Sequence, residues 1–220
     1  MPISNKHIVI TGAASGIGKE LVLQLAGSGN KILAIDINQE GLEILPKTSS
    51  QIQTLTLDLT KQDSVSAIFD WIELNWKTVY YFFANAGFAK FGTWEETDQH
   101  TFAKMLQINV LSPFETAKVL KQTQANHPCR LVVTASAMSY WPVPGYAAYA
   151  ATKASIHQFV ETIRGEGDGD WITLVYPGAT ETDFFKSAGK EIPKAFPVQS
   201  VQTVVRHILQ GVSKGKKKIY

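Results

Sequence analysis

Short hydrophobic runs alternate along the chain with longer stretches in which hydrophobic residues recur at helical spacing. The short runs are rich in β-branched residues and predict six strands, at residues 7–11, 31–36, 52–58, 79–84, 130–135 and 171–176. The longer amphipathic stretches predict helices at residues 16–28, 38–45, 61–75, 97–123, 146–164 and 198–212. Because residues 97–123 are long for one helix, we expect either a single long helix or a broken one.

This alternation indicates the α/β fold class. Continuous hydrophobic strands separated by helices are typical of a parallel sheet that helices cover on both faces. Right-handed connections between parallel strands then favour a doubly wound arrangement. The 220 residues suffice for one sizeable core and no stretch resembles a linker, so we expect a single domain over residues 1–220. The sheet has six strands, or seven if the segment from Lys218 to Tyr220 adds one.

The composition argues against several kinds of partner and site. The formal net charge is only +2, so no electrostatic attraction to nucleic acid or to a membrane surface is expected. The five histidines lie far apart and show no metal-ligand spacing, so no metal site is expected. Cys129 is the only cysteine, which excludes an internal disulfide. Without a signal-peptide pattern or a hydrophobic run of membrane-spanning length, the expected location is cytoplasmic.

A run of small residues follows the first predicted strand, where the next helix begins. Residues 11–18 read Thr-Gly-Ala-Ala-Ser-Gly-Ile-Gly, and the candidate ligand contacts among them are Gly12, Ser15, Gly16, Ile17 and Gly18. Small residues let a ligand approach the backbone, and a helix N-terminus offers N–H groups to a pyrophosphate. The glycine spacing differs from the general dinucleotide fingerprint, so a purely structural turn is the alternative.

The second predicted strand ends at Asp36. This position fits the roughly 20-residue spacing expected for an acid that binds the adenosine ribose hydroxyls. A carboxylate there also repels a 2′-phosphate, and Ile37, Asn38 and Gln39 follow it with no arginine among them. These features favour NAD(H), with NADP(H) still possible. A strand-end cap is the alternative role for Asp36 taken alone.

Tyr149 is followed four residues later by Lys153, which is one helical turn. The two side chains therefore share a helix face. An ammonium beside a phenol favours the phenolate, so the spacing predicts a lowered pKa for Tyr149 and a general acid or base.

Together with further motifs in the same order, these residues resemble the short-chain dehydrogenase/reductase family over about residues 6 to 182. Asp58 and Leu59 resemble the family's adenine-contacting pair, and Asn85-Ala86-Gly87 is similar to its Asn-Asn-Ala-Gly signature. Ala84 replaces the first Asn of that signature, a departure expected to weaken a local hydrogen bond that stabilises the sheet. The remaining matches are Asn109, Ser136 thirteen residues before Tyr149, and a segment that contains Pro177, Gly178, Thr180 and Thr182.

The resemblance implies a Rossmann-type domain and hydride transfer between a nicotinamide and an alcohol or carbonyl carbon. Tyr149 is then the proton donor or acceptor, Ser136 hydrogen-bonds the substrate oxygen, and Lys153 lowers the tyrosine pKa and holds the nicotinamide ribose. Asn109 fixes a water that relays protons. The implied cofactor-binding set is Gly12, Ser15, Gly16, Ile17, Gly18, Asp36, Asp58, Leu59, Asn85, Ala86, Gly87, Tyr149, Lys153, Pro177, Gly178, Thr180 and Thr182. A strand-end cap for Ser136 and a buried polar helix residue for Asn109 are the alternatives.

Several large hydrophobic residues lie next to these motifs. The candidate substrate contacts are Met138, Trp141, Tyr146, Phe88 and Phe184, with ordinary core packing as the alternative for each aromatic residue. They suggest a largely apolar alcohol or carbonyl compound of small to medium size. Residues 183–197 are expected to form a short substrate-covering loop. By resemblance, the two long helices suggest a homodimer or homotetramer.

Three functions agree with these patterns. The first is an NAD(H)-dependent oxidoreductase acting on an alcohol or carbonyl. The second is an NADP(H)-dependent reductase of 3-oxoacyl type. The third is a non-catalytic dinucleotide sensor with the same fold, since a fold alone does not fix function.

Overall fold

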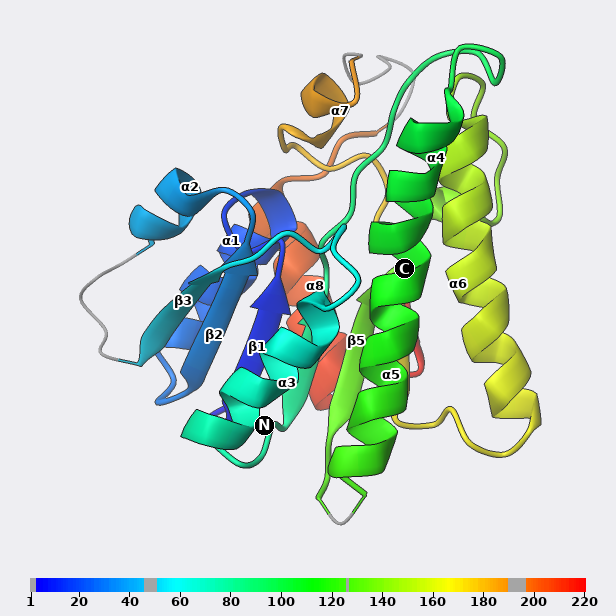
Figure 1. The fold of residues 1–220 in the computed structure, drawn as a ribbon. Helices are drawn as coiled ribbons and strands as arrows, with labels where there is room; N and C mark the ends of the chain where they lie inside the picture. Colours follow the sequence, from blue (N-terminus) through cyan, green and yellow to red (C-terminus); the bar gives the residue numbers. More distant parts are fainter. Residues whose placement is uncertain (1–2, 46–50, 126, 190–196) are drawn as a thin grey trace.

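A parallel sheet forms the centre of the protein, in a computed structural model that describes residues 3–45, 51–125, 127–189 and 197–220 (Figure 1). All its strand pairs are parallel, in the order β3-β2-β1-β4-β5-β6-β7. The strands are β1 His7–Thr11, β2 Lys31–Asp36, β3 Ile52–Thr56, β4 Tyr81–Ala84, β5 Arg130–Thr134, β6 Ile172–Val175 and β7 Lys218–Ile219.

Helices cover both faces of this sheet. They are α1 Gly16–Ala26, α2 Gln39–Glu43, α3 Ser64–Asn75, α4 Gln99–Leu106, α5 Ser112–Thr123, α6 Ala147–Gly165, α7 Phe184–Ser187 and α8 Val201–Ser213. Successive strand residues point to opposite faces, so the strands contribute to two cores. Val9 packs with α3, α5 and α6 in one core, whereas its neighbours Ile8 and Ile10 pack with α1, α2 and α8 in the other.

The predicted doubly wound sheet is confirmed, and its seventh strand forms. Lys218 and Ile219 pair with Leu174 and Val175 of β6, which answers the question that the sequence left open. Residues 97–123 are helical but irregular, because the π-helical turn Gln107–Leu111 separates α4 from α5. The short helix α7 was not predicted and lies in the expected covering loop, of which residues 190–196 fall outside the described residues.

The strand order determines where a site can form. From β1 the chain builds outward to β2 and β3, and it then returns to place β4 on the other side of β1. At such a reversal the connections leave in opposite directions, which opens a crevice beyond the carboxyl ends of the strands. In the part of the chain that the structure describes, no helix is long and apolar enough to cross a membrane.

Candidate active site at the carboxyl ends of the strands

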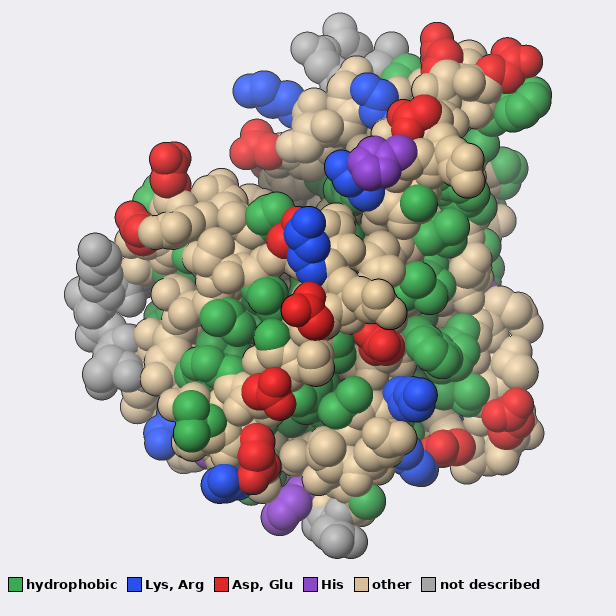
Figure 2. Space-filling view, in the orientation of Figure 1, with side chains coloured by type: hydrophobic (Ala, Val, Ile, Leu, Met, Phe, Trp, Pro, Cys, Tyr) green, Lys and Arg blue, Asp and Glu red, His purple; other side chains and the backbone are tan. Residues whose placement is uncertain are grey.

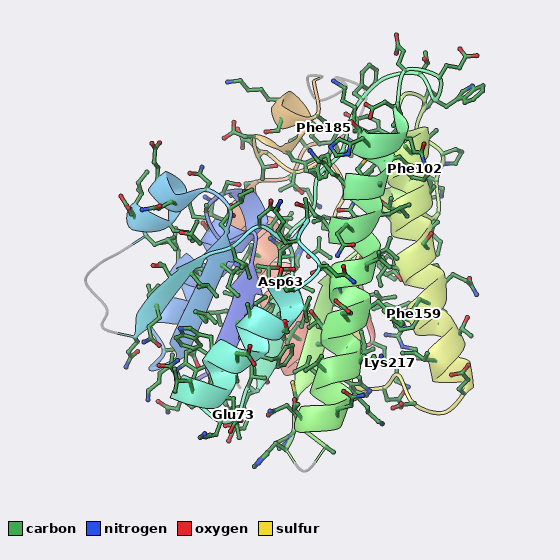
Figure 3. The ribbon with its side chains drawn as sticks, viewed as in Figure 1. Asp63, Glu73, Phe102, Phe159, Phe185 and Lys217 are labelled. Atoms are coloured by element: carbon green, nitrogen blue, oxygen red, sulfur yellow. The ribbon has the colours of Figure 1, made fainter. Side chains whose placement is uncertain are left out.

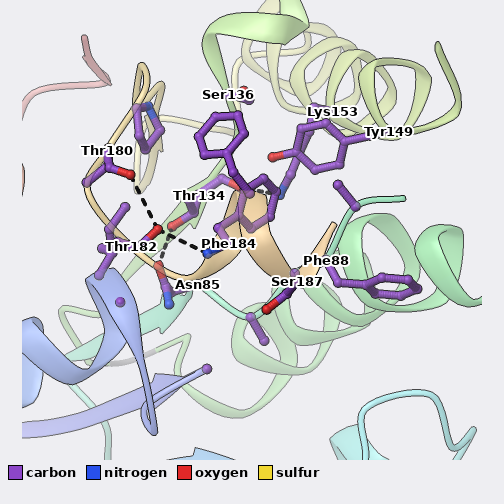
Figure 4. A pocket seen from close by; sticks show the side chains of 18 of the residues that line it. Asn85, Phe88, Thr134, Ser136, Tyr149, Lys153, Thr180, Thr182, Phe184 and Ser187 are labelled. Atoms are coloured by element: carbon purple, nitrogen blue, oxygen red, sulfur yellow. Dashed lines mark hydrogen bonds between the residues drawn. The ribbon is translucent and has the colours of Figure 1, made fainter. Parts of the chain in front are cut away.

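A cavity of about 770 Å³ lies at this crevice (Figure 4). Its wall contains residues that follow β1, β2, β4, β5 and β6, so segments far apart in the sequence meet there. Among the described residues, all the predicted site residues line it except Gly18 and Asn109: Gly12, Ser15, Gly16, Ile17, Asp36, Asp58, Leu59, Asn85, Ala86, Gly87, Phe88, Ser136, Met138, Trp141, Tyr146, Tyr149, Lys153, Pro177, Gly178, Thr180, Thr182 and Phe184.

The glycine-rich turn between β1 and α1 forms one wall of the cavity. Gly12 has a φ of +68°, a conformation that glycine adopts without strain. A Cβ on Gly18 would overlap the carbonyl oxygen of Gly12, so Gly18 lets the turn close on itself instead of facing the cavity. Ser15 makes no side-chain cap bond to α1, which leaves the N–H groups of the first turn for a ligand.

Two carboxylates extend this wall, and each is held by hydrogen bonds. The carboxylate of Asp36 accepts hydrogen bonds from the backbone N–H groups of Ala14 and Asn38, both at 2.9 Å. Asp36 therefore joins the end of β2 to the glycine turn. Asp58 accepts hydrogen bonds from the N–H and the hydroxyl of Thr60, at 2.9 and 2.7 Å, and these bonds lower the pKa of its carboxyl group.

The turn after β4 joins three strands at the floor of the cavity. The Asn85 amide donates to the Thr11 carbonyl oxygen at 3.2 Å and accepts from the Thr134 hydroxyl at 3.2 Å. The Thr11 hydroxyl oxygen accepts from the backbone N–H groups of Asn85 and Ala86, both at 3.1 Å. Thus Asn85 and Thr11 make the cross-strand bonds at this turn, where Ala84 has no side-chain group to contribute.

Ser136, Tyr149 and Lys153 meet on the opposite wall (Figure 4). Ser136 follows β5, and its hydroxyl oxygen accepts a hydrogen bond from the Met138 N–H at 3.1 Å. Tyr149 and Lys153 are on the first turns of α6 and both are buried. The Lys153 Nζ donates to the carbonyl oxygen of Thr134 at 2.6 Å and lies 5.7 Å from the centroid of the Tyr149 ring.

Burial controls the protonation of this pair. It raises the pKa of Tyr149, while a side-chain hydrogen bond with Ser136 acts in the opposite direction. It also lowers the pKa of Lys153 to about 8. The pKa of Tyr149 is therefore shifted in the direction opposite to that predicted from the helical spacing, because removal from water disfavours the charged form of both side chains.

Asn109 lies behind the cavity wall, in the π-helical turn between α4 and α5. Its side-chain oxygen accepts from the Phe88 N–H at 3.2 Å, and its amide donates to the Phe88 carbonyl oxygen at 3.1 Å and to the Thr152 hydroxyl at 2.9 Å. A small void next to it is lined by both Asn109 and Lys153. Asn109 therefore lies beside the buried side of Lys153 without reaching the main cavity.

The predicted substrate contacts belong to a hydrophobic cluster at one end of the cavity. Tyr146, Tyr149 and Phe185 are buried members of the cluster, and Phe88, Met138 and Phe184 pack against them. Phe102 of α4 also packs there, and Figure 3 shows it at the same end of the molecule as Phe185. Trp141 differs because it is 69% exposed at the rim. The same side chains therefore pack in a hydrophobic cluster and line the cavity.

Several residues that line the cavity were missed from the sequence, among them Ile37, Thr60, Ile108, Thr134 and Ser187. Thr134 could have been predicted as a site residue, since it is the last residue of β5 and the carboxyl ends of the strands face the site. Ile108 could not have been predicted in this way, because its position follows from the π-helical turn. Within the described ranges, no group of three His, Cys, Asp or Glu residues is arranged to hold a metal ion.

Comparisons with known proteins agree with this geometry. The 11-beta-hydroxysteroid dehydrogenase A of Sesamum indicum is 26% identical over 98% of this chain and 68% of its own. A short chain dehydrogenase/reductase from Burkholderia phymatum in complex with NAD superposes with a TM-score of 0.87 at 20% identity, covering 100% of this chain and 89% of that one. A short-chain dehydrogenase from Sphingobium yanoikuyae in complex with NADPH gives 0.86 at 22% identity, over 97% and 87%.

The strand order and the crevice at the carboxyl ends of the strands define a nucleotide-binding fold of the α/β class. The family model described as short chain dehydrogenase matches residues 6–193, so the chain belongs to that family. This makes it an enzyme of a class that acts on CH–OH and C=O groups with a nicotinamide dinucleotide.

Proposed function

We propose that the protein is an NAD(H)-dependent oxidoreductase that interconverts an alcohol and a carbonyl compound of small to medium size. The observation that carries this proposal is that Ser136, Tyr149 and Lys153 line the same cavity as the glycine turn and Asp36. The cofactor, when bound, supplies or accepts the hydride, and the protein supplies position and proton transfer.

The proposed proton donor to the carbonyl oxygen is Tyr149, which accepts the proton again when an alcohol is oxidised. A buried phenol with a raised pKa is protonated at neutral pH, as reduction requires. Ser136 hydrogen-bonds the same substrate oxygen and stabilises charge that develops on it. Lys153 holds the ribose, and its low pKa, about 8, lets it pass a proton toward the void beside Asn109.

The preference for NAD(H) over NADP(H) is proposed from Asp36. Its carboxylate is fixed at the cavity wall by two backbone N–H groups, and its neighbour on that wall is the apolar Ile37. A carboxylate there attracts ribose hydroxyls and repels a 2′-phosphate. The alternative, an NADP(H)-dependent reductase of 3-oxoacyl type, requires that the phosphate be accommodated beside this charge.

The substrate is proposed to be largely apolar because the cavity continues into the aromatic cluster. Phe88, Met138 and Phe184 line it there, with Trp141 at the rim. In the predicted covering segment, the described residues Asp183, Phe184, Phe185 and Ser187 line the cavity. Turnover of a bulky steroid together with inactivity on small substrates would contradict the proposed size.

We also propose a homodimer or homotetramer assembled through the long helices. Leu111, at the end of the π-helical turn, is 47% exposed, and Phe114 of α5 is 40% exposed. Figure 2 shows hydrophobic side chains gathered over α4 and α5. Phe114 also makes an edge-on contact with Phe159 of α6, with ring centroids 5.1 Å apart, so α5 and α6 present a joint apolar face.

Substitution of Tyr149 tests the catalytic proposal. In a turnover screen over alcohols and ketones with NADH and NADPH, Tyr149→Phe should lower kcat by about 10²–10⁴-fold, the usual contribution of general acid–base catalysis. Binding of NADH should persist. Tyr81→Phe is the matched control, because Tyr81 is the first residue of β4, at the end of the strand that faces away from the cavity.

Three results would each contradict a part of the proposal. Substantial turnover by Tyr149→Phe would remove this residue from the central role. Cofactor binding by the native protein without turnover of any alcohol or ketone would instead favour the dinucleotide sensor. Stronger binding of NADPH than of NADH, unchanged in Asp36→Ala, would overturn the cofactor assignment.

A further inference from the structure

The hydroxyl group of Tyr146 is buried and has no hydrogen-bond partner among the described residues. The side chain is only 1% exposed and is among the largest that are fully buried in the protein. Buried tyrosine hydroxyls normally find a partner, because leaving a polar group without one is unfavourable. An orphaned hydroxyl in a native fold therefore calls for an explanation.

The surroundings of Tyr146 are apolar apart from the active site itself. Its ring lies edge-on to Phe91 at 5.3 Å and to Phe185 at 6.2 Å between centroids. The ring of Tyr149 is 6.3 Å away, also edge-on. Its charge interaction with Tyr146 also contributes to the raised pKa of Tyr149, so the two hydroxyl groups influence each other.

The backbone holds Tyr146 in this place. Its N–H donates to the Val143 carbonyl oxygen at 3.1 Å, and its own carbonyl accepts from the Ala150 N–H at 2.8 Å, in the first turn of α6. Tyr146 and Tyr149 are three residues apart where α6 begins, so they share a side of that helix. Both side chains line the same cavity.

We propose that Tyr146 hydrogen-bonds a second oxygen of the substrate, vicinal or 1,3-related to the carbon that is oxidised or reduced. The inference rests on the proposed function and deepens it. Tyr149 and Ser136 engage the reacting oxygen, while the hydroxyl of Tyr146 finds in the substrate a partner that none of the described residues provides. The preferred substrates are thus apolar compounds with two oxygens, namely hydroxyketones, diketones or the corresponding diols.

The chemistry of the neutral phenol fits this role. Burial raises the pKa of Tyr146, so its hydroxyl stays protonated and can donate to a carbonyl or accept from an alcohol. Apolar neighbours exclude competing donors and strengthen a single hydrogen bond. A site built around a hydrogen bond discriminates against the analogue that lacks the second oxygen, because its own polar group is then left unpaired.

Matched ketones and one substitution test the proposal. The probes are 1-phenylpropan-1-one and its 2-hydroxy and 3-hydroxy derivatives, reduced by the native protein and by Tyr146→Phe. We expect the native protein to favour at least one hydroxyketone by about tenfold in kcat/KM, the usual effect of one hydrogen bond. Tyr146→Phe should lose this preference, because its kcat/KM should fall further on the favoured hydroxyketone than on the simple ketone, whereas Tyr81→Phe should keep it.

Thermal unfolding separates a substrate-binding role from a structural one. Because the hydroxyl has no partner among the residues that the structure describes, Tyr146→Phe without substrate should melt at or above the native temperature. A lower melting temperature would show that the hydroxyl stabilises the fold and would overturn the inference.

The kinetic results also distinguish a failure of this inference from a failure of the proposed function. Equal loss on all three ketones, no preference by the native protein, or no turnover of any of them would overturn the role of Tyr146. The proposed function would survive each of these results if the wider screen finds turnover that depends on Tyr149.

Discussion

At the scale of the residue, burial has the largest effect on the chemistry of the site. Lys153 is 3% exposed, and its ammonium donates a hydrogen bond to the Thr134 carbonyl oxygen. Burial disfavours the charged ammonium, so the pKa of Lys153 falls from 10.5 to about 8. The residue therefore titrates near the pH at which enzymes work, which suits a group that relays protons.

This shift predicts a pH-dependent stability. Between pH 8 and 10.5 the unfolded chain binds a proton at Lys153 that the folded protein has lost. Stability contributed by this residue therefore rises with pH across that window, by roughly 3 kcal/mol in total. Urea denaturation of the native protein and of Lys153→Met from pH 7 to 10.5 should show the native protein gaining on the variant by this order. A difference that stays constant with pH would contradict the shift.

At the scale of the element, two local irregularities shape the site. The π-helical turn Gln107–Leu111 interrupts the long helix and presents Asn109 to the backbone of Phe88. Such turns occur frequently at functional sites, because an extra residue redirects a side chain. The glycine turn is the second irregularity, and it is compact enough that its own backbone occupies the space a side chain at residue 18 would need.

Alanine at position 18 tests this compactness. The added Cβ would collide with the Gly12 carbonyl oxygen, so we expect Gly18→Ala to lower the free energy of unfolding by about 1–3 kcal/mol, as overpacking does. NADH binding should weaken as the turn shifts. Gly27→Ala is the control, because Gly27 caps the same helix with a φ of −78° and open space around its Cα. Equal stability of the two variants would contradict the explanation.

At the scale of the whole molecule, the sheet order determines which segments meet. β1 and β4 are neighbours although residues 12–80 separate them in the sequence, and the cavity opens where their connections diverge. The helical layer of α5 and α6 has an inner side that packs on the sheet, whereas Leu111 and Phe114 remain exposed on the outer side. The sheet order creates the site, and the exposed outer side of the helices suggests self-association.

A charged substitution on the outer helical face tests the assembly. In sedimentation, the native protein should be a dimer or tetramer, and Phe114→Glu should shift it toward the monomer, because a carboxylate cannot be buried there without a partner. Leu74→Glu, on the 82% exposed Leu74 of α3, should leave the assembly unchanged. A monomeric native protein would refute the proposed oligomer.

Much of the fold could be predicted because hydrophobic periodicity reports burial directly. The strands from His7–Thr11 to Ile172–Val175 were located within a few residues at their ends. The strand Lys218–Ile219 could not be assigned, since two residues carry no periodicity and their pairing depends on the exposed edge of β6. Helix α7 was missed for a similar reason, because one turn of helix has too few positions to show a pattern.

The sequence alone determined the order of the elements, the parallel sheet and the spacing that brings Tyr149 and Lys153 to one helix face, because these follow from local periodicity. Only the tertiary structure decided the direction of the Tyr149 pKa shift, the inward position of Gly18 and the buried Tyr146 hydroxyl, which has no partner within the described ranges. Each of these depends on how much water and which neighbours surround a group. Those surroundings are assembled from distant segments, and spacing along the chain does not encode them.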